Sequence, residues 1–420
     1  MTENQIKDNI DNPAQLELLF RGDKKGFQKA FYSVYEEISA HQAAEFWKNR
    51  LEQEFSTTID KKISISEILL LLLTCVVTCF LIQIPNIFNL YYTDEIFYQR
   101  NAGLIVIFGI TAFLYISKKQ LVLRNIIISL LVFIGSAVYV NLLPVNSDSQ
   151  SIILVYLHLP LMLWCLLGLV YINYDVKNIN LKIDYIKFNG DLAIWFVLIL
   201  VAGMILTFIT LGLFNAAGVS IEEFYFDYIV VCGLVSAPII STYIIKHQSG
   251  LTNKLAPIIA RLFTPLVLLT LICYLISIPI VGQDPFHDRD FLLIFNIMLL
   301  GVMSLITFSV SETSSSEKQR FNEIILLITT FVAILIDLGA LSAILYRLGE
   351  YGLTPNRIAV LVSNLLILTN LIFVLINLIQ VNFMKRELTK VESTISRFLY
   401  IYAFWTIFVV FIFPLLFGFK

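Results

Sequence analysis

One carboxylate lies deep within a long apolar segment of this sequence. Asp337 occurs in TTFVAILIDLGALSAILYRL, about ten residues before the segment ends, which is about 15 Å along a helix. A charged carboxylate at this depth of a bilayer costs about 2.5–3.5 kcal/mol even on a lenient insertion scale, so it must face protein or water. Proton exchange and cation coordination are the chemistries that suit such a group. We therefore predict a functional role for Asp337.

A polar residue recurs at every seventh position of the next apolar segment, with a further asparagine beside the stripe: Asn356, Ser363, Asn370, Asn377 and Asn364. Folding the two segments as a hairpin about Gly352 brings Asp337 level with position 367, where an amide could hydrogen-bond the carboxylate. The predicted intramembrane site consists of Asp337, Ser363, Asn364 and Asn370. For the asparagines alone, the favoured alternative is ordinary helix packing, because such interhelical hydrogen bonds contribute about 0.6 kcal/mol on average.

Three charged residues lie in the short stretch RLGEYGLTPNR, residues 347–357, between these two segments. Arg357 falls near the start of the second segment, where the positive end of a helix dipole disfavours a cation, so it should have an anionic partner. Glu350 is the nearest candidate, and it can also pair with Arg347 three positions earlier. The favoured interpretation is an Arg–Glu–Arg clasp that locks the hairpin. The alternative is an anion-binding lip at the mouth of a cavity.

The same stretch carries ordinary signals for ending one helix and beginning another. Gly349 or Gly352 can adopt the left-handed conformation that ends a helix. Thr354 suits an N-cap, and Pro355 suits the first helical position, where its missing N–H costs nothing. A turn this short predicts two antiparallel neighbouring helices.

The composition indicates the solvent in which these segments fold. The chain has 420 residues, of which 58% are hydrophobic and 14% charged, with a mean hydropathy of +0.81. A soluble domain has fewer apolar residues and about a quarter charged ones. The net charge of −2 gives no basic field for nucleic acid. The five cysteines lie in apolar runs and form neither a disulfide framework nor a metal-ligand pattern, so we predict no metal and no cofactor.

The apolar runs predict an all-α polytopic membrane protein with eleven spans after a polar N-terminal region. The predicted transmembrane domain is 63–420, and its spans lie near 65–84, 102–117, 125–143, 152–172, 192–214, 227–245, 256–281, 291–310, 322–348, 355–380 and 397–417. Lysines and arginines concentrate in the loops on one side of this arrangement. The positive-inside rule therefore predicts that the N-terminus is cytoplasmic and the C-terminus is outside.

Two further segments have readable patterns. Residues 1–62 are polar with helical periodicity and a capping signal at Asn12-Pro13, which predicts a small cytoplasmic helical region that could dock a protein partner. Residues 181–191, LKIDYIKFNGD, alternate apolar and polar and end on Asn-Gly. That alternation predicts a small cytoplasmic hairpin or strand before the fifth span.

Two stretches carry a resemblance to a known family. RLGEYGLTPNRIAVLVSNLL and the N-terminal run NPAQLELLFRGDKKGFQKAFYSVYEEI, followed by AEFWKNRLE, resemble a bacterial multipass membrane family termed domain of unknown function 4153, in particular its Bacteroidetes members. The resemblance covers both ends of the chain and its general layout. It implies a bacterial inner-membrane protein, and it implies no activity, substrate or catalytic residue.

Three classes of function remain open. An ion-coupled transporter of a solute or a lipid precursor accounts for the spans, the short loops and Asp337, and it is the favoured prediction. A signalling or scaffold component would use residues 1–62 to dock a partner. A membrane enzyme acting on a lipid-linked substrate would use the arginines at 347 and 357 for a phosphate, although no nucleotide-binding loop or hydrolase motif is present.

Overall fold

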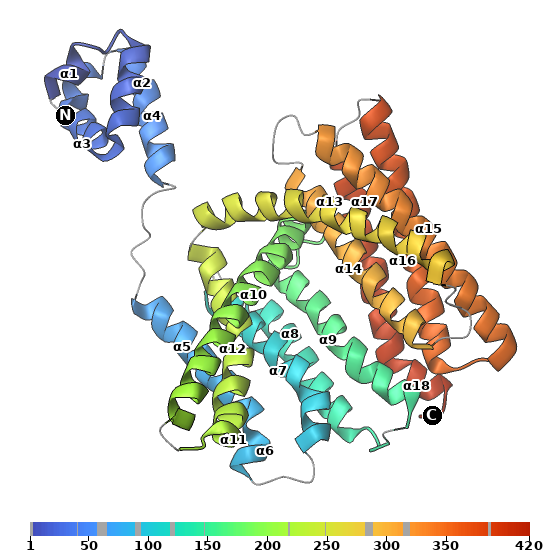
Figure 1. Ribbon diagram of the computed structural model, residues 1–420. Helices are drawn as coiled ribbons and strands as arrows, with labels where there is room; N and C mark the ends of the chain where they lie inside the picture. The colour runs from blue at the N-terminus through green and yellow to red at the C-terminus, as the bar shows by residue number, and fades with distance from the viewer. Residues whose placement is uncertain are drawn as a thin grey trace. The chain divides into compact units, whose positions relative to one another are not determined.

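The computed structural model is an assembly of helices (Figure 1). The structure describes residues 3–39, 41–56, 65–88, 94–117, 122–146, 148–216, 219–247, 249–281, 289–313, 320–384 and 388–420. No β-strand occurs within these ranges, and the predicted all-α class is confirmed. The chain divides into two compact units, Met1–Ile65 and Ser66–Lys420.

The first unit contains four helices: α1 (Glu3–Lys7), α2 (Pro13–Gly22), α3 (Lys24–Ile38) and α4 (Gln42–Ser56). The cap predicted at Asn12 is confirmed, since its side chain accepts the Gln15 N–H at 3.2 Å and Pro13 opens α2. The apolar faces of three helices enclose a core of aromatic side chains: Phe20, Phe27, Phe31 and Trp47. These residues give the unit a hydrophobic core of its own.

The second unit contains the remaining helices. In chain order they are α5 (Ile65–Ile82), α6 (Ile84–Ile87), α7 (Asp94–Ile116), α8 (Leu123–Leu142), α9 (Gln150–Tyr171), α10 (Ile179–Ala216), α11 (Glu222–Phe224), a π-helical turn (Tyr225–Val230), α12 (Val231–His247), α13 (Ser249–Val281), α14 (Arg289–Thr313), α15 (Arg320–Tyr351), α16 (Pro355–Met384), α17 (Thr389–Phe411) and α18 (Phe413–Leu416). The short α6, α11 and α18 lie beside the ends of the long helices.

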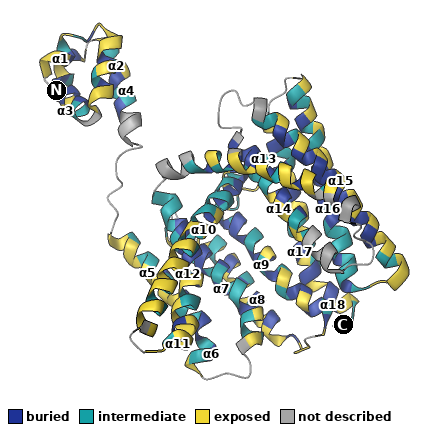
Figure 2. Ribbon diagram, in the orientation of Figure 1, coloured by how far each residue is buried: buried dark blue, intermediate teal, exposed yellow. Residues whose placement is uncertain are grey.

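The long helices are suited to a bilayer. Within the described residues, ten helices are long and apolar enough to cross a membrane. The eighth predicted span, 291–310, falls on α14, whose described apolar stretch, Asn296–Glu312, is shorter. On α5 the usual soluble pattern is inverted, because Leu69 and Val76 are exposed whereas Thr74 and Thr78 are buried. Exposed residues recur along the other long helices (Figure 2), and many of them are large and apolar, such as Phe208 of α10 and Phe404 of α17. The chain is built as a multi-pass membrane protein.

The second unit packs around two hydrophobic clusters. One is formed mainly by α7, α8, α9, α10 and α12, and the other mainly by α13 to α17 with two residues of α10. Helix α9 packs against α17 and thereby connects the two groups of helices. Helices α15 and α16 pack along each other as the predicted antiparallel hairpin, and α15 also contacts α13 and α14. Asp337 therefore lies on α15, a helix that packs against α13, α14 and α16.

The hairpin or strand predicted at 181–191 is wrong, because these residues form the beginning of helix α10. Their buried side chains form pairs three positions apart, Ile183 with Ile186 and Tyr185 with Phe188, which is a helical spacing that the short alternation concealed. Gly190 is not a turn residue. It lies where the ring of Phe308 on α14 approaches the α10 backbone so closely that a Cβ would collide with it.

This close approach gives a matched pair of substitutions on one helix. We expect Gly190→Ala to destabilise the second unit by about 1–3 kcal/mol, because the added methyl group overpacks the contact with Phe308. Gly203→Ala is the control, since nothing lies within 4 Å of its Cβ position and alanine favours a helix by up to about 1 kcal/mol. Thermal unfolding of the purified chain measures both. Equal melting temperatures for the two variants would contradict this packing.

Glu17 on α2 gives a pH-dependent prediction for the first unit. The hydrogen bond from Arg21 at 2.8 Å, supported by Arg50, lowers the pKa of Glu17 below its ordinary value. The folded state therefore gains stability from the ionised Glu17 above the unfolded pKa, and it loses this stability as the pH falls through the lower folded pKa.

We expect Glu17→Gln to weaken amide protection in α2 and α4 near neutral pH and to have no effect once Glu17 is protonated. Hydrogen exchange of the full chain, with both proteins compared at each pH, measures this difference. A difference between the proteins that stays the same from neutral to acidic pH would contradict the assignment to Glu17 ionisation.

Candidate functional site

Asp337 lies in the interior of the second unit. Its side chain belongs to α15 and is 0% exposed, and neither carboxylate oxygen has a hydrogen-bond partner. The residues one turn away on either side, Ala333, Ala340 and Leu341, belong to the hydrophobic cluster of α13 to α17. A carboxylate that is removed from water without a donor or a cation is strongly disfavoured in its ionised form. Asp337 is therefore a buried group that still requires a partner.

A second unsatisfied group belongs to Asn370 on α16. Asn370 is also 0% exposed, and its Nδ2 donates to the Tyr402 hydroxyl of α17 at 2.9 Å. Its Oδ1 is buried and has no hydrogen-bond partner. The Asp337 carboxylate lies within electrostatic range of the same Tyr402 hydroxyl, and α16 packs against both α15 and α17. Among the described residues, this place combines three buried acceptor oxygens that lack a donor.

The hydrogen bond expected between Asp337 and an amide of the polar stripe is not formed, because the stripe is directed towards other helices. Ser363 accepts a hydrogen bond from Trp405 Nε1 at 2.9 Å, and Asn377 donates to Thr394 Oγ1 at 2.7 Å. Both partners belong to α17. Asn364 donates to Asn296 of α14 at 2.8 Å. Ser363, Asn364 and Asn377 therefore join helices, whereas Asn370 remains with Asp337 at the candidate site.

The site has the chemistry of proton or cation exchange. All of its unsatisfied atoms are acceptors, so a proton or a positive ion would stabilise it, and an anion would not. Histidine and cysteine are absent from it, and the described part of the chain contains no group of three or more histidine, cysteine, aspartate or glutamate side chains that could hold a metal ion. A catalytic nucleophile paired with a base is likewise absent from these three residues. Binding and release of a cation or a proton is the activity that this arrangement supports.

The turn between α15 and α16 follows the predicted helix signals. Gly352 has a φ of 76°, and its N–H donates to the Leu348 carbonyl at 3.1 Å. Thr354 Oγ1 accepts the Arg357 N–H at 3.4 Å, and Pro355 is the first residue of α16. The turn is therefore shaped by local sequence, as expected from the glycine, threonine and proline.

The two arginines of the turn lie near one aromatic ring, that of Tyr351. Glu350 is exposed and forms no ion pair with either arginine, so the expected Arg–Glu–Arg clasp is not present in this structure. The guanidinium groups of Arg347 and Arg357 instead lie 6.0 and 5.5 Å from the centre of the Tyr351 ring. Arg357 Nη1 also donates to the carbonyls of Tyr351 and Gly352 at 2.7 Å each, where the dipole of α15 ends.

A buried arginine outside the predicted site, Arg100, has a structural role. Arg100 of α7 is 8% exposed, and it donates to the carbonyls of Asn141 and Leu143 at the end of α8, at 3.1 and 2.8 Å. Its Nε donates to the Tyr156 hydroxyl of α9 at 3.1 Å. Pro144 follows the end of α8 and has no backbone N–H to donate to the last carbonyls of that helix. Its position in the sequence therefore indicates that these carbonyls need another donor.

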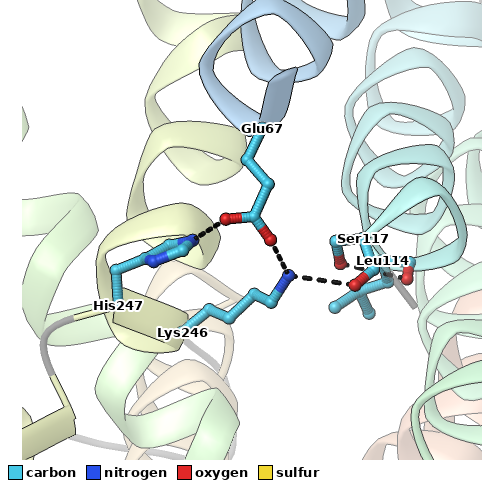
Figure 3. Close-up of polar contacts among 5 residues, drawn as sticks. All are labelled: Glu67, Leu114, Ser117, Lys246 and His247. Carbon is cyan, nitrogen blue, oxygen red and sulfur yellow. Dashed lines mark hydrogen bonds and ion pairs between the residues drawn. The ribbon is translucent and has the colours of Figure 1, made fainter. Parts of the chain in front are cut away.

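An ion-pair cluster joins three other helix ends (Figure 3). Lys246 of α12 donates to Glu67 Oε1 at 3.0 Å and to the Ser117 carbonyl at 2.9 Å, and His247 Nε2 lies 3.3 Å from Glu67 Oε2. Glu67 lies in the first turn of α5, and Ser117 follows the last turn of α7. Glu67 lies at the positive, N-terminal end of the α5 dipole, and Lys246 lies at the negative, C-terminal end of the α12 dipole, so both charges interact favourably with their own helices. This cluster fixes the ends of α5, α7 and α12 to one another.

We expect Lys246→Met to lower the free energy of unfolding by about 1 kcal/mol, because it removes charge-assisted hydrogen bonds from a partly exposed cluster. Lys177→Met is the matched control, since Lys177 is exposed in the connection before α10. Thermal unfolding at low and high salt measures both variants. The role of the cluster would be refuted if Lys246→Met were no more harmful than Lys177→Met.

Comparison with known proteins adds no assignment. No protein-family model, no curated protein and no solved structure matches this chain. The resemblance to domain of unknown function 4153 therefore stays a prediction. The functional argument depends on the geometry around Asp337.

Proposed function

We propose that the chain is a bacterial inner-membrane transporter of a solute or a lipid precursor, coupled to a proton or a cation at Asp337. The observation that carries this proposal is the complete burial of the Asp337 carboxylate without a hydrogen-bond partner. An intramembrane ionisable residue is a functional candidate by default. The predicted inner-face and outer-face loops and the resemblance to a bacterial membrane family support the location.

The site could couple ion binding to helix movement for a physical reason. Without an ion or a proton, Asp337 contributes an unfavourable buried charge to the packing of α15, α16 and α17. Occupancy removes that unfavourable term, so a bound ion favours the packed arrangement over one in which Asp337 meets water. A ligand shifts such an equilibrium by its differential affinity for the two states. Transport by alternating access requires this kind of shift.

A second candidate function is a scaffold that docks a partner through the first unit. The specific observation is that this unit has its own core and also exposes large apolar side chains, with Leu18 64% and Phe46 59% exposed. The enzyme alternative has less support, because Arg347 and Arg357 are placed against Tyr351, and Arg357 also binds two backbone carbonyls.

The proposal predicts opposite effects of Asp337→Asn on stability and on activity. In a buffer without alkali-metal ions, we expect the variant to be at least as stable as the original chain, since it replaces an unpaired buried charge by a neutral group of similar size. We also expect it to lose ligand-driven ion movement in proteoliposomes, measured with pH- and cation-sensitive dyes during a screen of solutes and lipid precursors.

Asn364→Leu is the control, because it breaks the bond to Asn296 and should cost about 1 kcal/mol without removing the coupling group. The proposal would be contradicted if Asp337→Asn kept full ion coupling. A clear loss of stability in Asp337→Asn would instead assign Asp337 a structural partner.

A further inference from the structure

We infer that Asp337, Asn370 and Tyr402 form a binding site for a single alkali-metal cation such as Na⁺. The inference deepens the proposed function by naming the ion of the same site, but the binding step can be tested without transport. It depends on the oxygen atoms that the structure leaves without a donor at this place: Asp337 Oδ1, Asp337 Oδ2 and Asn370 Oδ1.

The number of unsatisfied oxygens favours a cation over a proton. A proton on Asp337 creates one O–H donor, which satisfies one acceptor and leaves another carboxyl oxygen buried and unpaired. A cation needs no donor of its own and would be stabilised both by the carboxylate oxygens and by the Asn370 Oδ1 that lack donors. The Tyr402 oxygen, which already accepts the Asn370 Nδ2–H, keeps a second lone pair for the same ion. An all-oxygen set of ligands suits a hard cation.

The charge of the site favours a monovalent ion. Asp337 is the acidic residue of the site, and none of the described basic side chains forms an ion pair with it. Tyr402 is a titratable side chain within electrostatic range of Asp337. One alkali-metal ion neutralises the carboxylate, whereas a divalent ion would leave a net positive charge in a fully buried, apolar environment.

The orientation of the Asn370 amide is the structural feature on which the inference turns. The bond from Nδ2 to Tyr402 directs Oδ1 away from the tyrosine as a free acceptor. In the reverse orientation Tyr402 would donate to Oδ1, and Nδ2 would face the surroundings as a donor. That orientation would supply a donor near Asp337 and would remove the cation site.

The test measures thermal unfolding of the purified full-length chain in NaCl, KCl, MgCl₂ or choline chloride at equal ionic strength. We expect Na⁺ or K⁺ to raise the melting temperature saturably, by at least about 3 °C, relative to choline. The cation concentration for half the effect should rise at acidic pH, because protons compete for Asp337. The shift should disappear in Asp337→Asn and in Asn370→Ala.

Asn377→Ala is the matched control. It removes a similar hydrogen bond between α16 and α17, to Thr394, without removing an unsatisfied oxygen, and it should keep the cation-induced shift. Three results would overturn the inference: no difference between alkali-metal ions and choline, a shift that persists in Asp337→Asn, or a larger Mg²⁺ shift that depends on Asp337.

The two proposals fail in distinguishable ways. Cation binding lost in Asp337→Asn, together with proteoliposomes that move no solute, would support the cation site and refute transport. Solute movement driven by a proton gradient, without any cation-induced stabilisation, would support transport and refute the cation site.

Discussion

The structure depends on one constraint: a polar group in an apolar interior needs a partner within the protein. The second unit, Ser66–Lys420, satisfies this constraint in several ways. Thr74 and Thr78 donate to carbonyls of their own helix, and Arg100 donates to carbonyls at the end of α8. Asn364 pairs with an amide of α14. Asp337 and Asn370 lie in the same interior with oxygens that no donor reaches. This contrast is the reason to assign them a ligand.

The two residues with unsatisfied oxygens lie on neighbouring helices, so a ligand bound to them would affect helix packing. Asp337 is on α15 and Asn370 is on α16, the two members of a hairpin whose turn is fixed by Gly352 and the cap at Thr354. The Tyr402 hydroxyl on α17 accepts a hydrogen bond from Asn370 and lies within electrostatic range of Asp337. An ion held among the three would add electrostatic attraction where the packing otherwise contains an unfavourable charge. Binding and helix packing are thereby linked at one place.

Local features were predictable from the sequence, and tertiary partners were not. The cap at Asn12, the left-handed glycine at the turn and the burial of Asp337 follow from residue types and spacing, and the structure contains all three. The partners of the polar stripe depend on which neighbouring helix each face meets, so Tyr402 was missed. Residues 181–191 were predicted as a hairpin or strand because a short alternation of apolar and polar residues resembles a strand. In the structure they begin α10 and pack against α14, a tertiary contact that the local pattern does not contain.

The most direct measurement of the central claim is the infrared difference spectrum between the original chain and Asp337→Asn, recorded from acidic to alkaline pH with and without Na⁺. The account predicts a carboxylic-acid band from Asp337 at acidic pH. This band should give way to a carboxylate band at higher pH, and Na⁺ should shift that change to lower pH. A carboxylate band that is present at every pH and indifferent to Na⁺ would contradict the account, because it would show that Asp337 already has a permanent partner.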